Sequence, residues 1–354
     1  VDGSTIGTYT YDPSIFDDEP LRVAVDRRND DVYVVGFDCV IGPSDFRWVI
    51  MRFDTNLAPY PGWPKYYNPT NSIDVAYGVA VDEVNNRFVV VGSQWTNPTD
   101  SDWVVKSYEI SSGAEVGNYT PILSTQDDIP MDVVIDSQGN IIAVGFDQEP
   151  GNEEWRIVKL DPSCTLVWNK TCNPSLSLDS AESVTVDKSN DIIVVGWDQN
   201  TTYNDNRWRI MKLSSSGESL WNYTFNPSDG YDKAKGVVMD SGGNIIVGGF
   251  DELPPFGDYN LQCRIMKFLL LPVHNIDTGL NYVTIQEAIN ANETLDGHTI
   301  FVEDGIYREN VVVNKTLSII GENRATAIID GNYTENVVTI HANNTSIASF
   351  TVRN

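Results

Sequence analysis

Short apolar runs alternate with turn residues over the first 270 residues, and the pattern repeats. In residues 237–251, "VVMDSGGNIIVGGFD", two runs rich in Val and Ile flank a turn of Asp, Ser, Gly and Asn. These turn residues tolerate positive φ and bond their own backbone, so the phrase predicts a β-hairpin. Near-continuous apolar runs are typical of strands buried on both faces. No run in this part has helical periodicity, which indicates an all-β array.

The hairpin phrase occurs five times, each time followed by a third run such as "RWRIMKL". The aspartates that close the first run are Asp26, Asp82, Asp136, Asp187 and Asp240, and the glycines that close the second are Gly36, Gly92, Gly145, Gly196 and Gly249. A fourth run with an aromatic residue, such as "WNYTFNP", completes most copies. Four strands in a repeat of about fifty residues are the signature of a propeller blade. The sequence therefore predicts a five-bladed β-propeller over residues 1–270.

The fourth run is missing from the last repeat. Residues 7–14, "GTYTYDPS", match residues 221–228, "WNYTFNPS". We expect the N-terminal strand to complete the fifth blade, which would close the ring and remove free sheet edges. The repeats resemble the simple bacterial and archaeal propeller repeats of the "VAVDSSGNVYVTG" type. That resemblance implies the fold and leaves function open, because the family is a scaffold.

The four cysteines fit this closure. Cys263 stands at the start of the third run, where the other repeats carry Trp48, Trp103, Trp155 and Trp208. Cys39 follows "GFD", where later repeats have Gln or Glu. A closed ring would make blades five and one neighbours, so we expect a Cys39–Cys263 disulfide at the seam. Cys164 and Cys172 flank one hairpin and are expected to form a second bridge. Buried free thiols are the alternative for both pairs.

The pattern changes after about residue 275. "NYVTIQEAINAN" (281–292) predicts a short strand and an amphipathic helix with Ile285, Ala288 and Ile289 on one face. Short β-runs then recur at about twenty residues per turn, which favours a right-handed parallel β-helix with the helix as its N-terminal cap. We expect a linker at 271–280 and about three coils in 281–354. Such a solenoid is incomplete without further coils or a second subunit.

The order "TIQEAI…GHTIFVEDGIYRENVVVNKTLSIIGEN…IIDGN" resembles the start of the pectin-methylesterase-like and surface-protein β-helix superfamily, common at archaeal cell surfaces. The resemblance implies the coil fold over about 80 residues. The catalytic aspartates and glutamines of its esterase branch lie on later coils, so no catalytic residue is carried over. Tyr307, Glu309 and Asp330 match structural turns and caps.

Charge and sequons point to an exported protein. Asp and Glu number 50 against 23 Lys and Arg, a formal charge of −27, which disfavours a nucleic-acid partner. Asn-X-Ser/Thr sequons stand at Asn118, Asn169, Asn200, Asn222, Asn292, Asn314, Asn332, Asn343 and Asn344. The longest apolar run, near 268–273, is too short to span a membrane. The chain opens at Val1 with no signal peptide, as expected for a mature chain or a fragment. We expect an extracellular, cell-surface glycoprotein.

Motifs for catalysis are absent from the sequence. Asp304, Arg308 and Glu309 are a weak lyase-like set, better interpreted as surface turn residues. His274, His298 and His341 have no metal-ligand spacing. Calcium could bind the loops after the second strands, although turn capping is the preferred interpretation; the aspartates in these loops are Asp38, Asp147, Asp198 and Asp251. The four third-strand tryptophans could line a sugar site, but packing between blades is preferred.

We therefore expect that the chain is not an enzyme and that it binds no cofactor. Calcium is the one candidate cofactor that the sequence leaves open. The favoured function is a structural component of an archaeal cell surface, as an S-layer, sheath or filament, that associates with its own copies or other surface proteins. One alternative is a carbohydrate-binding adhesin that uses the propeller face. A second is a carbohydrate-active enzyme whose catalytic coils lie beyond residue 354.

Overall fold

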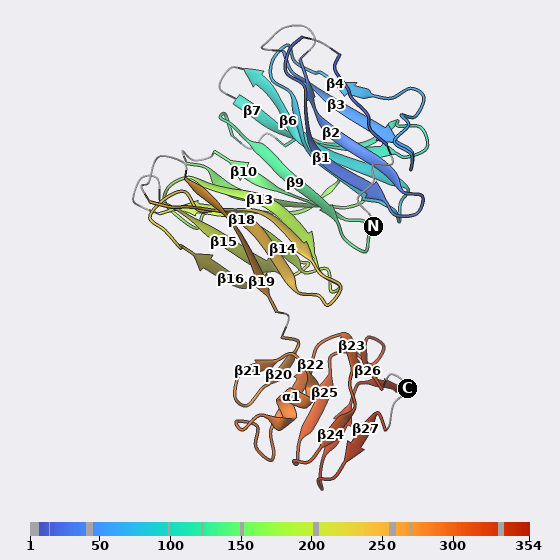
Figure 1. Ribbon diagram of the computed structural model, residues 1–354, viewed down its shortest axis with the longest axis vertical. Coiled ribbons are helices and arrows are strands. Elements are labelled where there is room, and N and C mark those ends of the chain that lie inside the picture. Colours follow the sequence, from blue (N-terminus) through green and yellow to red (C-terminus); the bar gives the residue numbers. More distant parts are fainter. Residues whose placement is uncertain are drawn as a thin grey trace. The chain divides into compact units, whose positions relative to one another are not determined.

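The chain forms two compact units (Figure 1). The computed structural model describes residues 7–13, 15–39, 45–97, 100–121, 124–148, 152–200, 205–254, 260–269, 271–331 and 336–354. The first unit comprises residues 1–239 and 246–266, and the second comprises residues 240–245 and 267–354.

The first unit is a five-bladed β-propeller, as the repeats predicted. Blade 1 contains β1 (Glu19–Asp26), β2 (Asp31–Asp38), β3 (Arg47–Phe53) and β4 (Lys65–Tyr67), and blade 2 contains β5 (Val75–Asp82), β6 (Arg87–Asn97), β7 (Asp100–Glu109) and β8 (Glu115–Tyr119). Blade 3 contains β9 (Ile129–Ile135), β10 (Ile141–Asp147), β11 (Glu154–Leu160) and β12 (Leu166–Cys172), and blade 4 contains β13 (Asp179–Val186), β14 (Ile192–Gln199), β15 (Asn206–Leu213) and β16 (Ser219–Phe225). Blade 5 contains β17 (Lys233–Met239), β18 (Ile245–Glu252) and β19 (Leu261–Phe268).

The repeated turn of the first hairpin is held by its aspartate. In blade 3 the Oδ1 atom of Asp136 accepts hydrogen bonds from the N–H groups of Gln138 and Asn140, both at 2.9 Å. Gly139 has a φ of +81°, a conformation that favours glycine. The turn motif therefore has a local cause in each repeat, namely a side chain that replaces a backbone acceptor.

The third-strand tryptophans fasten each blade to the next. Their indole N–H groups donate to backbone carbonyls of the following blade, and all four side chains are fully buried. The pairs are Trp48 with Ser93 at 3.0 Å, Trp103 with Phe146 at 3.0 Å, Trp155 with Trp197 at 3.1 Å, and Trp208 with Phe250 at 3.1 Å. The preferred interpretation of these residues, packing between blades, is confirmed.

The expected closure by an N-terminal strand is not formed in the described residues and stays a prediction. Residues 7–13 form no strand, and the described part of blade 5 has three strands. The segment lies on blade 1 instead, because its aromatic side chains find partners there. The ring centroids of Tyr9 and Phe53 are 4.8 Å apart, and the Tyr11 hydroxyl donates to Asp38 Oδ2 at 2.7 Å.

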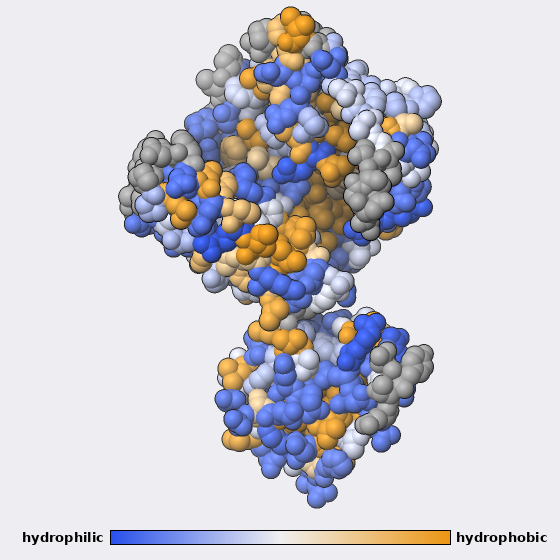
Figure 2. All heavy atoms as spheres, in the orientation of Figure 1, coloured by the Kyte–Doolittle hydropathy of each residue, from blue (hydrophilic) through white to orange (hydrophobic). Residues whose placement is uncertain are grey.

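The seam between blades 5 and 1 exposes apolar side chains from both sides. Val23 on β1, Val238 on β17 and Ile265 on β19 are all exposed. Figure 2 shows apolar surface in the middle of this view of the propeller, in the region that carries β1 and β18 in Figure 1. The equivalents of Val23 and Ile265 between the other blades are buried, so the seam is the point where the inter-blade packing stops.

No disulfide joins the four cysteines in this structure. Cys164 lies in the turn that precedes β12, and Cys172 is the last residue of that strand. Because β12 rises about 3.3 Å per residue over seven residues, the two are roughly 20 Å apart, far beyond disulfide reach. The Cys164–Cys172 expectation is therefore wrong. Cys39 is buried and Cys263 is exposed at the open seam, so their bridge is not formed here and stays a prediction for a closed ring.

The second unit contains one short helix and recurring parallel strands. Its elements are β20 (Val273–Asn275), β21 (Leu280–Tyr282), α1 (Ile285–Asn290), β22 (Thr299–Val302), β23 (Gly305–Arg308), β24 (Val311–Val313), β25 (Ser318–Gly321), β26 (Ala327–Asp330), β27 (Val338–Ile340), β28 (Ser346–Ala348) and β29 (Thr351–Arg353). Parallel pairing gives the orders β22-β25-β28, β23-β26-β29 and β24-β27. Like residues stack in register, as Ile300, Ile319 and Ile347 show.

Helix α1 covers the core of this unit, as its sequence predicted. Ile285, Ala288 and Ile289 are fully buried against the apolar residues of the strands. The segment 271–280, expected as a linker, contains β20, because fully buried Val273 belongs to the same core. The described residues include no helix long and apolar enough to cross a membrane.

Candidate functional site

Strands β13 and β14 of blade 4 and β17 of blade 5, with the loop before β11 of blade 3, bring titratable side chains together near one aromatic ring. We name Glu153, Glu182, Trp197, Lys233 and Lys235 the inner-strand cluster. The Lys233 Nζ atom lies 3.5 Å from the centroid of the Trp197 ring. The Trp197 indole N–H donates to Glu182 Oε1 at 2.7 Å, and Lys235 Nζ donates to Glu182 Oε2 at 2.5 Å. A cation, an aromatic face and a carboxylate are thus held in contact.

Burial sets the protonation behaviour of this cluster. Desolvation lowers the pKa of Lys233 to about 8; Glu182 opposes that shift, and the neighbouring positive charge of Lys235 adds to it. Desolvation raises the pKa of the Glu153 carboxyl, and the nearby Asp127 and Glu182 carboxylates add to the rise. Shifted pKa values of this kind gather at functional sites, which makes the cluster a candidate for ligand binding or proton transfer.

A hollow of about 470 Å³ lies beside the cluster. Its lining comes from β1, β13, β17, β18 and β19 and includes the polar side chains Arg22, Ser183 and Lys235. The Lys235 side chain is nearly half exposed there although its ammonium group contacts Glu182. A small polar ligand in this hollow would therefore meet a lysine that is already paired with a carboxylate.

A neighbouring carboxylate, Asp132 on β9, serves the fold. Its Oδ2 atom accepts hydrogen bonds from Ser183 Oγ at 2.7 Å and from the Val184 N–H at 3.1 Å, both on β13. Desolvation raises its pKa, and these bonds work against that rise. Asp132 therefore ties blade 3 to blade 4 at their inner edges.

The aspartates considered for calcium pair with arginines. Asp38 bonds Arg47, Asp147 bonds Arg156, Asp198 bonds both Arg207 and Arg209, and Asp251 bonds Arg264. Each guanidinium comes from the start of the third strand. It neutralises the aspartate carboxylate that was considered as a calcium ligand. Among the residues that the structure describes, no group of His, Cys, Asp or Glu is arranged to hold a metal ion. The signal for these pairs was the recurring Arg beside the third-strand Trp.

Four further aspartates at the starts of inner strands were missed by the sequence analysis. They are Asp74, Asp128, Asp179 and Asp232. Each accepts a hydroxyl hydrogen bond from the Ser or Thr four residues earlier and an N–H from the end of the second strand, as Ser124 and Gln148 do for Asp128. Burial raises the pKa of Asp74, Asp128 and Asp179 to about 6. The Ser/Thr-x-x-x-Asp spacing, which follows "NP" for Asp74, Asp179 and Asp232, was the available signal.

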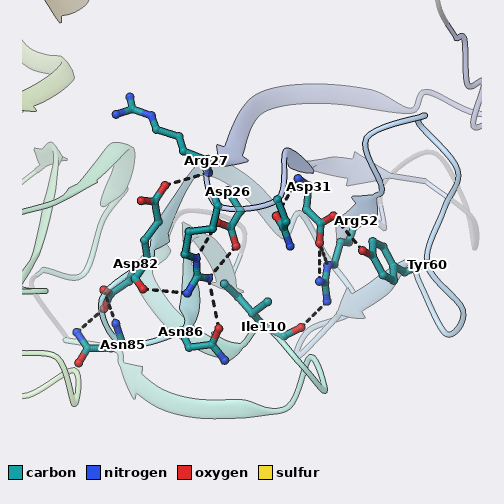
Figure 3. A network of polar contacts seen from close by, with 12 residues as sticks. Asp26, Arg27, Asp31, Arg52, Tyr60, Asp82, Asn85, Asn86 and Ile110 are labelled. Carbon is teal, nitrogen blue, oxygen red and sulfur yellow. Dashed lines mark hydrogen bonds and ion pairs between the residues drawn. The ribbon is translucent and has the colours of Figure 1, made fainter.

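A polar network joins blades 1 and 2 at the opposite ends of these strands (Figure 3). Arg52 bonds Asp31 at 2.6 Å and donates to the Ile110 carbonyl at 2.5 Å, while the Tyr60 hydroxyl also donates to Asp31. Arg28 pairs with Asp26 at 2.7 Å and reaches the Glu83 carbonyl of blade 2. Arg28 and Arg52 each pair with a carboxylate of blade 1 and donate to a backbone carbonyl of blade 2, so the network holds these two blades together.

The residues considered in the second unit have structural contacts. Glu309 accepts the N–H groups of Ile285 and Gln286 at the start of α1, at 3.0 and 2.9 Å, and the Tyr307 hydroxyl donates to the Glu303 carbonyl at 2.8 Å. Asp330 pairs with Arg353. Of the lyase-like set, the Glu309 carboxylate is therefore occupied by the N-terminus of α1. His274 stacks on Phe301 and pairs with Glu303.

The predicted glycosylation sites lie mostly at the surface. Exposed asparagines are Asn118, Asn169, Asn222, Asn292, Asn314, Asn343 and Asn344. Asn200 is partly buried, and its Nδ2 group donates to Asp205 at 2.7 Å. Asn332 lies outside the described residues. Occupancy of these sequons stays a prediction.

Comparison with known proteins gives one local similarity in sequence. No protein-family model matches the chain. A cell surface glycoprotein of Methanothermus fervidus is 40% identical over 81 residues, which are 23% of this chain and 13% of that protein. The chain thus matches a small part of the length of that relative.

Solved structures resemble the chain at low sequence identity. A xylan β-1,4-xylosidase from Bacillus halodurans has a TM-score of 0.39 and 13% identity, with 74% of this chain and 54% of that chain covered. An exo-β-1,3-galactanase from Phanerochaete chrysosporium has a TM-score of 0.42 and 13% identity over 75% and 62%. The β-propeller domain of the trilobed protease from Pyrococcus furiosus has a TM-score of 0.38 and 11% identity over 70% and 67%.

These neighbours correct one expectation. Several of them are glycoside hydrolases, so the expectation that the chain is not an enzyme is wrong as an exclusion. The absence of local catalytic motifs does not exclude activity, since residues on different blades can meet in space without any local spacing. The chain is an all-β protein with a five-bladed propeller and a local similarity to an archaeal cell surface glycoprotein.

Proposed function

We propose that this chain is part of an extracellular cell-surface glycoprotein and that its propeller binds carbohydrate at the inner-strand cluster. The local similarity to a cell surface glycoprotein supports the location. The observation that carries the binding function is the contact of Lys233 and Glu182 with the Trp197 indole beside an open hollow.

The chemistry of the cluster suits a sugar. Carboxylates such as Glu153 accept hydrogen bonds from sugar hydroxyl groups, and Arg22 and Lys235 at the hollow donate to ring oxygens or to an acidic sugar. Ligand sites combine a few convergent polar groups with apolar lining, here Val237, Val238 and Ile246. The lysines favour an anionic saccharide such as a uronic acid over a neutral one.

Binding should be measured on a glycan array and then by calorimetry with the best saccharide, with calcium present and with a chelator. Lys235→Met and Glu153→Gln should each weaken binding without unfolding the propeller. Glu218→Gln, an exposed carboxylate on the turn between β15 and β16, is the matched control and should leave it unchanged. No binding to acidic or neutral saccharides in either condition would reject the proposal. Hydrolysis of the bound saccharide would extend it to catalysis.

A second function, association through strands, is favoured by the outer edge of β19. No described strand pairs with this edge, and Ile265 on the same strand is exposed. We propose that residues 7–13 pair with β19, since they already lie at the turn between β3 and β4 of blade 1. Outer strands elsewhere contact that same turn of the next blade, as Lys170 on β12 contacts Gly217 of blade 4. Pairing within one chain would close the ring, and pairing between copies would link them.

Light scattering separates these two forms. A monomer in which cross-linking or oxidation joins Cys39 to Cys263 within one chain would support ring closure. Dimers or longer assemblies that dissociate when residues 7–13 are deleted would support exchange between copies, as expected of a surface-layer or filament component. A monomer unaffected by the deletion would reject both.

We also propose that residues 281–354 begin a right-handed parallel β-helix. The three parallel pairings and the stacked Ile300, Ile319 and Ile347 support it. An experimental structure tests this proposal: a right-handed path from β22 through β23 and β24 to β25, repeated in the next coil, would support it, and any other path would reject it.

A further inference from the structure

Three glycosylation sequons occupy one equivalent position on three successive blades. Across the ladder from the third strand, Asn118 pairs with Lys106 in blade 2, Asn169 with Val158 in blade 3, and Asn222 with Met211 in blade 4. The third-strand residue is buried in each case, and the asparagine on the outer strand is exposed. The sequon threonines, Thr120, Thr171 and Thr224, are exposed as well.

An exposed apolar residue precedes each of these asparagines by two positions. Val116, Val167 and Leu220 are 55%, 54% and 51% exposed. Each is the extra residue of a β-bulge, since the pairing register shifts at that point in all three outer strands. A bulge turns its extra side chain out of the ladder. The repeat therefore places a large apolar group about 7 Å along the strand from an exposed amide, three times.

These strands are also sheet edges. β8, β12 and β16 each pair on one side only among the described strands, so their outer N–H and C=O groups could template pairing with another chain. Bulges and bulky polar groups are devices that prevent such pairing. The three edges have the bulge, and the sequon supplies the attachment point for a bulky polar group.

We infer that Asn118, Asn169 and Asn222 are N-glycosylated and that their glycans shield the outer edges of blades 2, 3 and 4. In each case the Asn Nδ2 atom loses a proton and forms a bond to the anomeric carbon of a saccharide supplied by a lipid-linked phosphate or pyrophosphate donor. The C–O bond to the phosphate breaks, and the phosphate leaves with the electron pair. The first sugars then lie over the exposed Val116, Val167 and Leu220.

The sequon is missing from the equivalent segments at the open seam between blades 5 and 1. β4 of blade 1 reads "KYY", without a sequon, and the N-terminal segment "GTYTYDP" carries Thr8 where "WNYTFNP" carries Asn222. Glycans therefore follow the rim of blades 2 to 4 and stop on both sides of the open seam. This inference is independent of carbohydrate binding at the inner-strand cluster.

Occupancy is tested by glycopeptide mass spectrometry on the protein isolated from its native cells. The expected result is glycan mass on the peptides that contain Asn118, Asn169 and Asn222. Thr120→Ala, Thr171→Ala and Thr224→Ala should each abolish the modification at its own site while retaining the asparagine. Unmodified asparagine at all three positions in the secreted protein would overturn the inference.

Shielding is tested by a crossed set of variants in the same cells. The triple variant T120A/T171A/T224A should bind more of an apolar dye and scatter more light than the parent chain. Adding V116T, V167T and L220T should restore the parent behaviour, because the apolar groups are then removed. As matched control, V116T/V167T/L220T alone should change neither readout in the glycosylated chain. If the triple variant unfolds, N118Q/N169Q/N222Q gives the comparison; unchanged dye binding in a folded, unglycosylated chain would overturn the shielding function.

Discussion

Trp155 donates its indole N–H to the backbone carbonyl of Trp197, 3.1 Å away in the next blade, and Trp197 in turn donates to Glu182 at 2.7 Å. One residue of this relay fastens two blades, and the next supports the candidate binding cluster. Packing between blades and the geometry of the cluster are therefore coupled through the position of Trp197.

Trp155→Phe should destabilise the propeller by about 1–3 kcal/mol, because a buried carbonyl loses its donor and the smaller ring leaves unfilled space. Urea unfolding followed by circular dichroism measures this difference. Trp221→Phe on the outer strand β16, where the side chain is only partly buried, is the matched control and should have a smaller effect. Equal effects of the two substitutions would contradict the inter-blade function of Trp155.

Stability should rise as the pH is lowered from 7 toward 5. Burial raises the pKa of Asp74, Asp128 and Asp179 to about 6 in the folded chain, above the value near 4 in the unfolded chain. The folded state then binds more protons, so this stabilisation is full below about pH 4 and is lost as the pH rises through about 6. Urea unfolding at pH 7, 6 and 5 measures the slope.

Asp128→Asn should make that pH dependence shallower, since it removes one of the titrating groups. Asp229→Asn, an exposed carboxylate on a loop, should leave the slope unchanged. A stability that falls steadily between pH 7 and pH 5 in the parent chain would show that the three aspartates remain ionised.

Lys233 should react with an amine-directed acylating reagent at a lower pH than other lysines. Its pKa is lowered to about 8 by burial, so its neutral amine is half populated there. Peptide mass spectrometry after short labelling at pH 7, 8 and 9 measures the rate at Lys233 against exposed Lys188. Glu182→Gln should lower this pKa further, because the Glu182 carboxylate raises it. Labelling that does not respond to Glu182→Gln would contradict the contact geometry.

The cysteines should differ strongly in reactivity. Cys263 is exposed and should react rapidly with a thiol reagent, whereas Cys164 is buried and its pKa is raised to about 11. Titration of the folded and the urea-unfolded chain, with mass mapping of the labelled peptides, measures both. A folded chain in which Cys263 is protected and joined to Cys39 would show that the seam closes in solution.

The blades were predictable because their cause is local. The Asp136 type of turn and the Val/Ile runs repeat within each fifty-residue unit, and Trp155 recurs at a fixed distance from them. The fate of residues 7–13 was not predictable, since Tyr9 and Tyr11 suit both an outer strand of blade 5 and the surface of blade 1. The local sequence pattern does not distinguish these two packing positions, because both can accommodate the same aromatic side chains.

The candidate cluster was missed for a different reason. Glu182, Trp197 and Lys233 come from three strands in two blades, so no spacing along the chain connects them. The pairing of Asp198 with Arg207 and Arg209 was likewise invisible until the register of β14 and β15 placed them side by side. These carboxylates, for which calcium was the less favoured interpretation, pair with guanidinium groups across the ladder.

The indole contacts give the ring a direction. Each of these four hydrogen bonds runs from one blade to its successor, and blade 5 has Cys263 in place of the tryptophan donor. The five blades therefore form a directional series, in which the first blade only donates such a hydrogen bond and the last blade only accepts one. Blades 1 and 5 each share one of these indole hydrogen bonds with a neighbour, whereas blades 2 to 4 share two, so a pulling force along the chain would detach an end blade first.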